Sequence, residues 1–258
     1  MEIVVPVKMV PDVVEELEID ASGRTLDRSF LKLRINEFDE HAVEEALLLK
    51  EKHGGKVTVV ALDAPEVDEA LFTCMAKGAD RIVKVTGGPE EAVTSHEAAR
   101  ILGEILKSIP CDLVLTGVQS AEDRDGQVGP LLAGILGLPH VSVVSAVDLL
   151  EGGRSVVVKQ EYAGGLMAEI EVDLPALLGI QAAGHSPRYA SVSKVRQLMK
   201  TAKIDEVAVT AAPSSSGSEV LRLFKPEAAG RAKMLEGSPE EVADQLVALF
   251  SEKGFVKG

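Results

Sequence analysis

The segment from Asp112 to Pro139, DLVLTGVQSAEDRDGQVGPLLAGILGLP, most constrains how this chain can fold. It begins as a short apolar strand, continues through a polar turn that contains Gly126, and becomes a helix of small residues near Gln127. A loop that joins a strand to a helix N-terminus directs backbone N–H groups and the positive end of the helix dipole at one spot. This pattern favours a nucleotide at the carboxyl end of a parallel sheet, although a plain polar turn with a helix cap has the same appearance.

Strand-like and helix-like segments alternate through the first half of the chain. Apolar runs predict strands at 3–7, 56–62, 81–85 and 112–116, and capped or amphipathic runs predict helices at 36–53, 66–77, 94–108 and 127–137. Residues 11–35 read as irregular, with a hairpin around Gly23, and Pro6 suggests that the first strand lies at an edge or ends there. The short connections predict a Rossmann-like parallel sheet with helices on both faces.

The pattern changes after Pro139. Runs at 142–150, 154–162, 166–174 and 176–181 are separated by Gly-Gly and Pro turns, which favours antiparallel additions to the sheet. A polar loop with a helix is expected over 186–203, no long element over 204–237, and a flexible spot at the run SSSGS. Ser238, Pro239 and Glu241 predict the start of a last helix that ends near Lys253.

These segments suggest two parts, a nucleotide-binding α/β domain over 1–203 and a C-terminal arm over 204–258. The arm contains one isolated amphipathic helix, and such a helix needs a surface to cover its apolar side. Packing on the chain's own sheet and packing around a partner subunit remain equally open from the residues alone.

Composition excludes several classes of function. The net charge of −14 would repel nucleic acid, and an aromatic content of 3% with no Trp does not provide a stacking platform for single strands. No apolar run reaches the length of a membrane span, and the start MEIVVPVKMVPD lacks the features of a signal peptide, so we expect a cytoplasmic protein without membrane insertion. Cys74 and Cys111 have no metal or disulfide spacing and are expected to be buried, reduced thiols.

The sequence contains no recognisable catalytic machinery. It has no nucleophile–base pair, and none of its histidines has metal-ligand spacing. His41 is expected to have an ordinary surface role, and Glu44 and Glu45 resemble a solvated helix face. We therefore predict no catalytic residue and no metal site, and we look for a binding function.

Four segments together resemble the beta subunit of electron-transfer flavoprotein. They are the start IVVPVKMVPD, the helix start NEFDE followed by AVEEAL, the loop GVQSAEDRDGQVGPLLAGILGLP, and the segment HSPRYASVSKVRQLMK. They occur in the expected order over nearly the whole chain. The resemblance implies a Rossmann-like chain that pairs with an alpha subunit, which holds most of the FAD, and that wraps its C-terminal arm around that subunit.

The resemblance also implies an electron carrier, not an enzyme by itself. Electrons would come from acyl-CoA dehydrogenase-type flavoenzymes of fatty acid oxidation and leave toward a membrane quinone oxidoreductase. This chain would hold a structural AMP in the ordinary branch of the family, whereas in the electron-bifurcating branch a second FAD takes that place and meets NADH. The motif QVGP favours the bifurcating branch, but the residues before it do not complete the pattern of that branch.

The resemblance implies roles for particular residues. Asn36 would lie near the base or ribose, Phe38 would lie toward the alpha-bound flavin, and Arg124 would either contact phosphate or pair with Asp123. The expected cofactor-binding residues are Val7, Lys8, Asn36, Phe38, Asp63, Ala64, Thr116, Asp123, Arg124, Gln127, Val128 and Gly129.

A partner-recognition loop is expected within 186–200. Val192 stands where the family usually has a leucine that enters a pocket of the dehydrogenase, and this shorter anchor would bury less area. The residues expected to recognise the partner are Tyr189, Ala190, Ser191, Val192, Ser193, Lys194, Val195 and Arg196. A different class of protein, an ATP-binding regulatory α/β domain that forms a homodimer, is the alternative, but it explains the long arm poorly.

Overall fold

The structure is a computed structural model that describes residues 1–258 except 30, 89–93, 210–219, 227–231, 233 and 257–258. The run SSSGS lies outside the described residues. The chain divides into two compact units, Met1–Leu221 and Arg222–Gly258, which are described separately.

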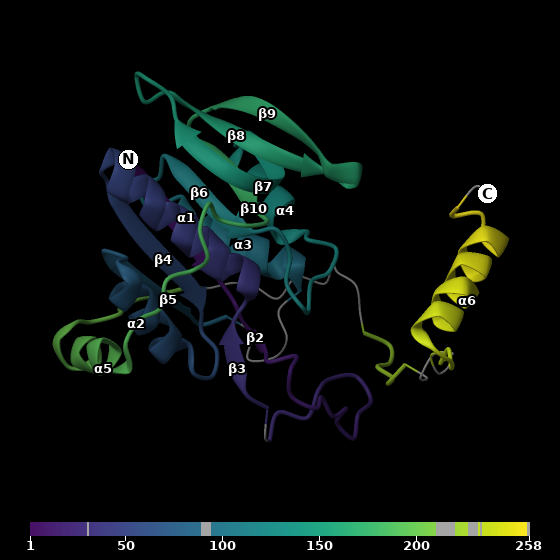
Figure 1. The fold of residues 1–258 in the computed structure, drawn as a ribbon. Helices are drawn as coiled ribbons and strands as arrows, with labels where there is room; N and C mark the ends of the chain where they lie inside the picture. The colour runs from purple at the N-terminus through teal and green to yellow at the C-terminus, as the bar shows by residue number, and fades with distance from the viewer. Residues whose placement is uncertain (30, 89–93, 210–219, 227–231, 233, 257–258) are drawn as a thin grey trace. The chain divides into compact units, whose positions relative to one another are not determined.

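The first unit contains a nine-stranded sheet in the order β11-β5-β4-β1-β6-β10-β7-β8-β9 (Figure 1). Neighbouring strands are parallel from β11 to β7, and β8 and β9 continue the sheet antiparallel. The strands of this sheet are β1 (Glu2–Val7), β4 (Lys56–Leu62), β5 (Arg81–Thr86), β6 (Leu113–Gly117), β7 (His140–Leu149), β8 (Ser155–Tyr162), β9 (Leu166–Asp173), β10 (Ala176–Ile180) and β11 (Asp205–Ala208).

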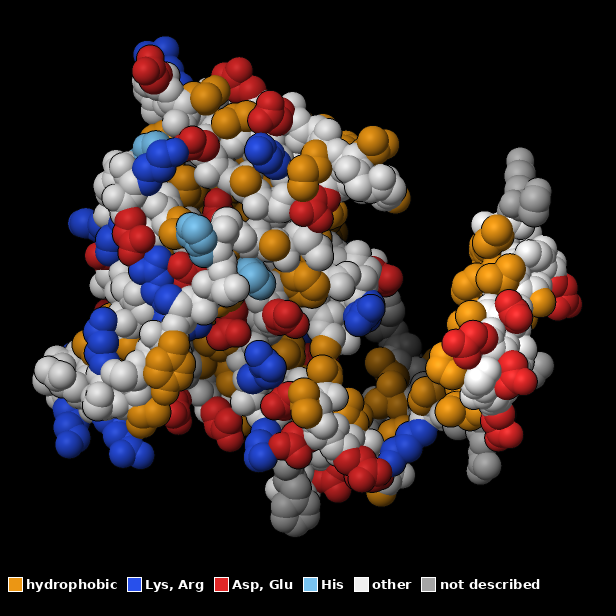
Figure 2. Space-filling model, viewed as in Figure 1, with side chains coloured by type: hydrophobic (Ala, Val, Ile, Leu, Met, Phe, Trp, Pro, Cys, Tyr) orange, Lys and Arg blue, Asp and Glu red, His pale blue; other side chains and the backbone are white. Residues whose placement is uncertain are grey.

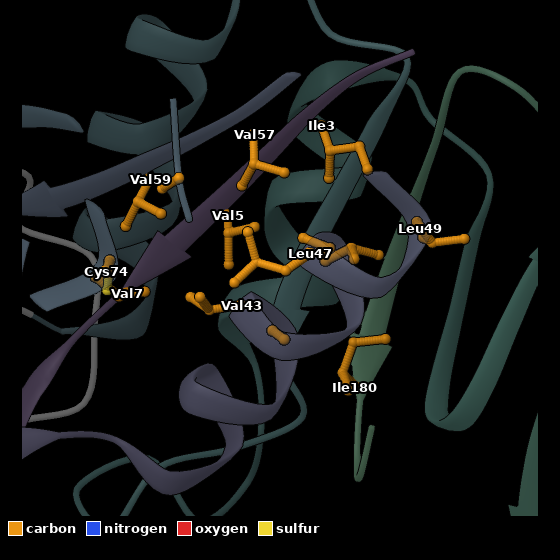
Figure 3. Packing of buried hydrophobic residues seen from close by; sticks show 14 of the residues in the cluster. Ile3, Val5, Val7, Val43, Leu47, Leu49, Val57, Val59, Cys74 and Ile180 are labelled. Carbon is orange, nitrogen blue, oxygen red and sulfur yellow. The ribbon is translucent and has the colours of Figure 1, made fainter. Parts of the chain in front are cut away.

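Helices cover both faces of the sheet, as the alternating sequence pattern predicted. The side chains of Ile3, Val5 and Val7 pack with α1 (Glu37–His53) and α2 (Val67–Lys77) on one face, as Figure 3 shows in part. Val4 points to the other face, where it belongs to a second buried cluster with residues of α3 (Ser95–Leu106) and α4 (Val128–Leu136). This alternation follows from the two-residue period of a strand buried on both faces.

The helix starts have the predicted chemistry. Thr94 and Ser238 each cap a helix through a capping box, and Pro239 lies in the first turn of α6 (Pro239–Glu252). Ser191 caps α5 (Val192–Thr201), which lies within the predicted loop-and-helix segment. The hairpin around Gly23 is confirmed by an antiparallel bridge between Ile19 and Leu26.

One prediction about the sheet is wrong, and another is right in only one of its two alternatives. The run at 176–181 was expected to be antiparallel, but β10 lies between β6 and β7 and is parallel to both, because the chain returns to the sheet after the β8–β9 ribbon. Pro6 does not mark an edge, since β1 lies between β4 and β6, but it does lie at the strand end, one residue before β1 ends at Val7. The β1–β6 ladder ends at Val4 and Val114, and Pro6 is paired only with Val60 of β4, so the proline lies beyond the ladder on the β6 side.

Three short strands were missed. β2 (Met9–Pro11) and β3 (Leu33–Ile35) form a small antiparallel sheet inside the region read as irregular. β11 pairs with β5 in a region where no long element was expected. Strands of three or four residues are too short to show a clear period in the sequence.

The second unit contains α6, and none of its described side chains is buried. Hydrophobic side chains gather along one side of this helix and acidic ones along another (Figure 2). Among the described residues, no helix is both long and apolar enough to cross a membrane.

Candidate functional site

The central strands β1 and β6 mark a reversal in the direction of winding. From β1 the chain moves outward through β4 to β5, and then returns through α3 to β6 on the other side of β1. In an open parallel sheet, ligands bind outside the carboxyl ends of the two strands at such a switch point. The ends of β1 and β6 are therefore the expected binding edge.

Two side chains hold the loop after β6 over this edge. The side-chain amide of Asn36 donates a hydrogen bond to the carbonyl of Gln119 over 2.8 Å. The ammonium of Lys8 forms an ion pair with Glu122, with 2.8 Å between Nζ and Oε2. Asn36 precedes α1 but its side chain does not cap that helix. Its amide is instead used to fix the loop, at the switch point where we expected nucleotide contacts.

A buried carboxylate joins the two strand ends directly. Asp39, in the first turn of α1, accepts the N–H of Lys8 over 2.8 Å and the N–H of Gly117 over 3.0 Å. Burial raises the pKa of Asp39 to about 7, against the opposing effect of these N–H donors, the Asn36 side chain and the charge of Lys8. Nothing in the local sequence pattern shows that the side chain of Asp39 reaches two strands.

The titration of Asp39 leads to a prediction about stability. Because its folded-state pKa lies above the ordinary value of 3.8, its favourable contribution is complete below that value and is lost as the pH rises through about 7. We compare the free energy of unfolding of the wild type with that of Asp39→Asn. The wild-type value minus the variant value is expected to fall as the pH rises from 3.8 to about 7. Urea unfolding of both proteins at several pH values measures the difference, and a rise with pH would contradict the assignment.

The start of α4 has only a few N–H donors for a ligand. The carboxylate of Asp123 accepts the N–H of Gln127 over 3.2 Å, and Pro130 has no N–H. The first N–H groups of a helix have no partner within the helix, so those of Val128 and Gly129 are the donors available here. Asp123, which we expected beside phosphate, lies at the same helix end and closes the loop.

Gly129 is closely surrounded by polar atoms. A Cβ built at Gly129 would lie 3.1 Å from Thr116 Oγ1 and 3.4 Å from His140 Nε2. Both atoms are buried, and among the described residues they are the buried side-chain nitrogen and oxygen atoms without a hydrogen-bond partner. Burial also lowers the pKa of His140, which favours the neutral imidazole. Buried polar atoms without partners beside a helix N-terminus fit a phosphate group or an ordered water.

The other predicted site residues are divided between this edge and the surface. Asp63 and Ala64 follow β4 at the same edge of the sheet, and the N–H of Asp63 donates to the carbonyl of Val85. Phe38 is half-buried, with its Cβ against Gly117. The side chain of Val7 belongs to the core, and Arg124 is exposed. The structure thus brings Lys8, Asn36, Thr116 and Gly129 together more clearly than Arg124.

The glutamates Glu44 and Glu45 do not form a solvated face. They are 3% and 4% exposed. Glu45 accepts the N–H groups of Val147 and Gly184, each over 3.0 Å. Glu44 accepts hydrogen bonds from both the backbone and the guanidinium of Arg188. The prediction failed because the long segment after β10 has no regular partner for its backbone N–H groups. Side chains of α1 supply the hydrogen-bond acceptors instead.

His41 belongs to the same arrangement. Its Nδ1 accepts the N–H of Ala183 over 3.1 Å, so the ring has a structural role in place of the ordinary surface role. Together these α1 side chains fasten the backbone between β10 and α5. The predicted recognition residues begin immediately after this anchored stretch, at Tyr189.

The recognition segment presents only part of its sequence to solvent. Tyr189 is 82% exposed and Val192 is 53% exposed, whereas Val195 is buried and packs inward. Ala190 is partly buried against the same core. Ser191 accepts the N–H of Lys194 as the helix cap. The exposed residues of the segment are Tyr189, Ser191, Val192, Ser193, Lys194 and Arg196.

Cys74 and Cys111 are both free, and burial raises the pKa of each thiol to about 12. Cys74 is buried as expected, and Cys111 is half-buried. Across the described ranges, no group of three or more His, Cys, Asp or Glu side chains is placed to hold a metal ion.

Comparison with known proteins identifies the family. The family profile described as "Electron transfer flavoprotein domain" matches residues 24–212. The chain belongs to the electron transfer flavoprotein family. An "Electron transfer flavoprotein subunit beta" of Methylophilus methylotrophus is 35% identical, over 98% of this chain and 98% of its own length. A protein with the same description from Clostridium acetobutylicum is 32% identical over 99% of this chain and 100% of its own length.

A third relative broadens the electron transfer flavoprotein comparison. "Protein FixA" of Azorhizobium caulinodans is 31% identical over 96% of this chain and 93% of its own length. The family match confirms the resemblance seen in the sequence. It also replaces the alternative of an ATP-binding regulatory domain, since the matched residues span most of the α/β unit.

Proposed function

We propose that this chain is the beta subunit of a heterodimeric electron-transfer flavoprotein. It pairs with an alpha subunit that holds most of the FAD, accepts electrons from acyl-CoA dehydrogenase-type flavoenzymes, and passes them toward a membrane quinone oxidoreductase. The observation that carries this proposal is the family match. The switch point between β1 and β6, where ligands bind in parallel sheets, agrees with it.

The nucleotide proposed for this chain is a structural AMP. The N–H groups of Val128 and Gly129 and the hydroxyl of Thr116 would hold its phosphate, and Asn36 and Lys8 keep the loop in place. Bound AMP supplies no redox chemistry and stabilises the folded chain by mass action. The FAD of the alpha subunit supplies the electron-carrying chemistry, and this chain contributes binding and positioning.

The C-terminal arm is proposed to pack on the alpha subunit. Its helix exposes Leu246, Val247 and Phe250, and Phe255 beyond the helix is 77% exposed. A helix with an uncovered apolar side is stable mainly when another surface buries that side. The family resemblance implies that the alpha subunit provides the surface that buries the apolar side of this helix.

Removing the last helix of the arm leads to a prediction that separates folding from assembly. Because no described side chain of α6 is buried, a chain that ends at residue 236 should keep the melting temperature of the first unit. Its yield of heterodimer should fall about tenfold or more, since each apolar side chain that loses its cover removes roughly 1.5–3 kcal/mol. Differential scanning calorimetry and co-purification measure the two effects. A truncated chain that assembles normally would contradict the proposed role.

The recognition segment is proposed to contact the electron-donating flavoenzyme. Tyr189 and Val192 present apolar surface beside the basic residues Lys194 and Arg196. Arg188 fixes the start of this segment through Glu44 and Glu51. A preorganised segment binds with a smaller loss of conformational entropy than a mobile one.

The reaction is tested by choosing the electron donor. Under anaerobic conditions, the flavin of the heterodimer should be reduced by an acyl-CoA substrate with its dehydrogenase, and NADH alone should leave it oxidised. Rapid bleaching by NADH would instead support the bifurcating branch with a second FAD. Failure of both donors would contradict the electron-carrier proposal.

A further inference from the structure

The central strands separate before they reach the binding edge. The β1–β6 ladder pairs Ile3 with Leu113 and Val4 with Val114, and it does not continue to the ends of the strands. Beyond this point the two strand ends are joined by a side chain. Asp39 Oδ2 accepts the N–H of Lys8 over 2.8 Å, and Oδ1 accepts the N–H of Gly117 over 3.0 Å.

One carboxylate therefore bridges the two strand ends. Both N–H groups donate to oxygens of the same rigid group, and Asp39 is only 6% exposed. A Cβ at Gly117 would overlap Asp39 Oδ1 and come within 2.8 Å of Phe38 Cβ, so the glycine allows this close approach. A shorter, longer or neutral side chain at position 39 cannot hold both N–H groups at the same spacing.

We propose that Asp39 is a positioning residue that sets the width of the crevice between β1 and β6, and through it the affinity for the nucleotide phosphate and base. Asp39 acts on the backbone of Lys8 and Gly117 and does not contact the ligand itself. This inference rests on the proposed function, which places a nucleotide at this edge.

The charge of Asp39 is essential to the arrangement. An ionised carboxylate accepts both N–H groups, whereas a protonated carboxyl turns a hydroxyl donor toward one of them. Burial raises its pKa to about 7, so the two forms interchange near neutral pH. The charged or titratable groups that act on Asp39 are Lys8, which follows β1, and Cys74 of α2. Glu122 pairs with Lys8, and Lys77 pairs with Glu40 beside Cys74.

The test measures AMP affinity in the complete heterodimer formed with the alpha subunit. Exchange of radiolabelled AMP is followed in the wild type and in Asp39→Asn at pH 8 and pH 6. The variant is expected to bind about tenfold more weakly at pH 8, because one N–H would face an amide donor. At pH 6 the ratio should approach one, since the wild-type carboxyl is then also neutral.

Asp80→Asn is the matched control. Asp80 also binds a strand N–H, that of Val57 over 2.8 Å, but at the opposite end of the sheet. This variant should keep wild-type AMP affinity at both pH values even if it melts at a lower temperature. An effect of equal size in both variants would show general destabilisation and overturn the inference.

Asp39→Glu is the second variant, and its AMP affinity provides the test if Asp39→Asn does not fold. It keeps the charge but lengthens the side chain by one methylene, so AMP binding should weaken at pH 8. Unchanged affinity at pH 8 in either position-39 variant would overturn the inference and leave the proposed function intact. A wild-type heterodimer that binds no AMP would instead contradict the proposed function itself.

Discussion

Replacing Gly129 by leucine is expected to lower the AMP content of the purified heterodimer by about tenfold or more. The new Cβ would lie 3.1 Å from Thr116 Oγ1 and 3.4 Å from His140 Nε2, and the rest of the leucine needs further space. The side chain would push α4 away from β6 and distort the helix N-terminus at which phosphate is proposed to bind. Overpacking of this kind also destabilises the fold by roughly 1–3 kcal/mol.

Gly134→Leu is the control for this prediction. Gly134 lies on the same helix, and a Cβ there would meet no atom within 4 Å. It makes the same change in helix propensity without closing the site. AMP released by denaturation is measured by chromatography, and urea unfolding gives the stability. If Gly129→Leu retains full AMP and full flavin, phosphate does not bind at this helix end.

Arg188→Ala is expected to destabilise the protein by about 3–5 kcal/mol, because it leaves a buried carboxylate without its charged partner. The Glu44 side chain is 4% exposed and lies 2.8 Å from the guanidinium, whereas Arg188 also reaches Glu51. These interactions raise the pKa of Arg188 above its ordinary value. The change should also increase hydrogen exchange at Tyr189 and the residues after it, since their anchor is lost.

Arg81→Ala measures what an exposed pair contributes. Arg81 forms an ion pair with Asp205 over 2.7 Å, but the two side chains are 44% and 51% exposed. Its loss should cost no more than about 1 kcal/mol. The double variant Arg188→Ala/Glu44→Ala should recover part of the stability lost in Arg188→Ala. Equal effects of the two arginine variants, measured by urea unfolding, would contradict the assignment of a buried anchor.

The sequence predicted the features that depend on local pattern. Helices with clear caps, such as those that start at Thr94 and Ser238, and the buried strands of the parallel sheet were correctly located. The loop from Gln119 to Gly129 was also recognised, because its strand, polar turn and helix are contiguous in the chain. The combination of four weak segments was specific enough to indicate the family.

The rest depends on contacts between distant residues. The parallel position of β10 and the central position of β1 are set by the route of the chain and not by the residues of either strand. Asp39 and Glu45 look like ordinary helix charges until the fold places backbone N–H groups against them. His140 joins the site only because β7 pairs with β10 beside α4.

The most direct test of the central claim is the identity of the bound nucleotides. The chain is co-expressed with an alpha subunit, the purified heterodimer is denatured, and the released FAD and AMP are measured by chromatography. The proposed electron carrier predicts one FAD and one AMP per heterodimer. Two FAD without AMP would contradict a structural AMP in this chain and support the bifurcating branch, and ATP without flavin would contradict the electron-carrier function.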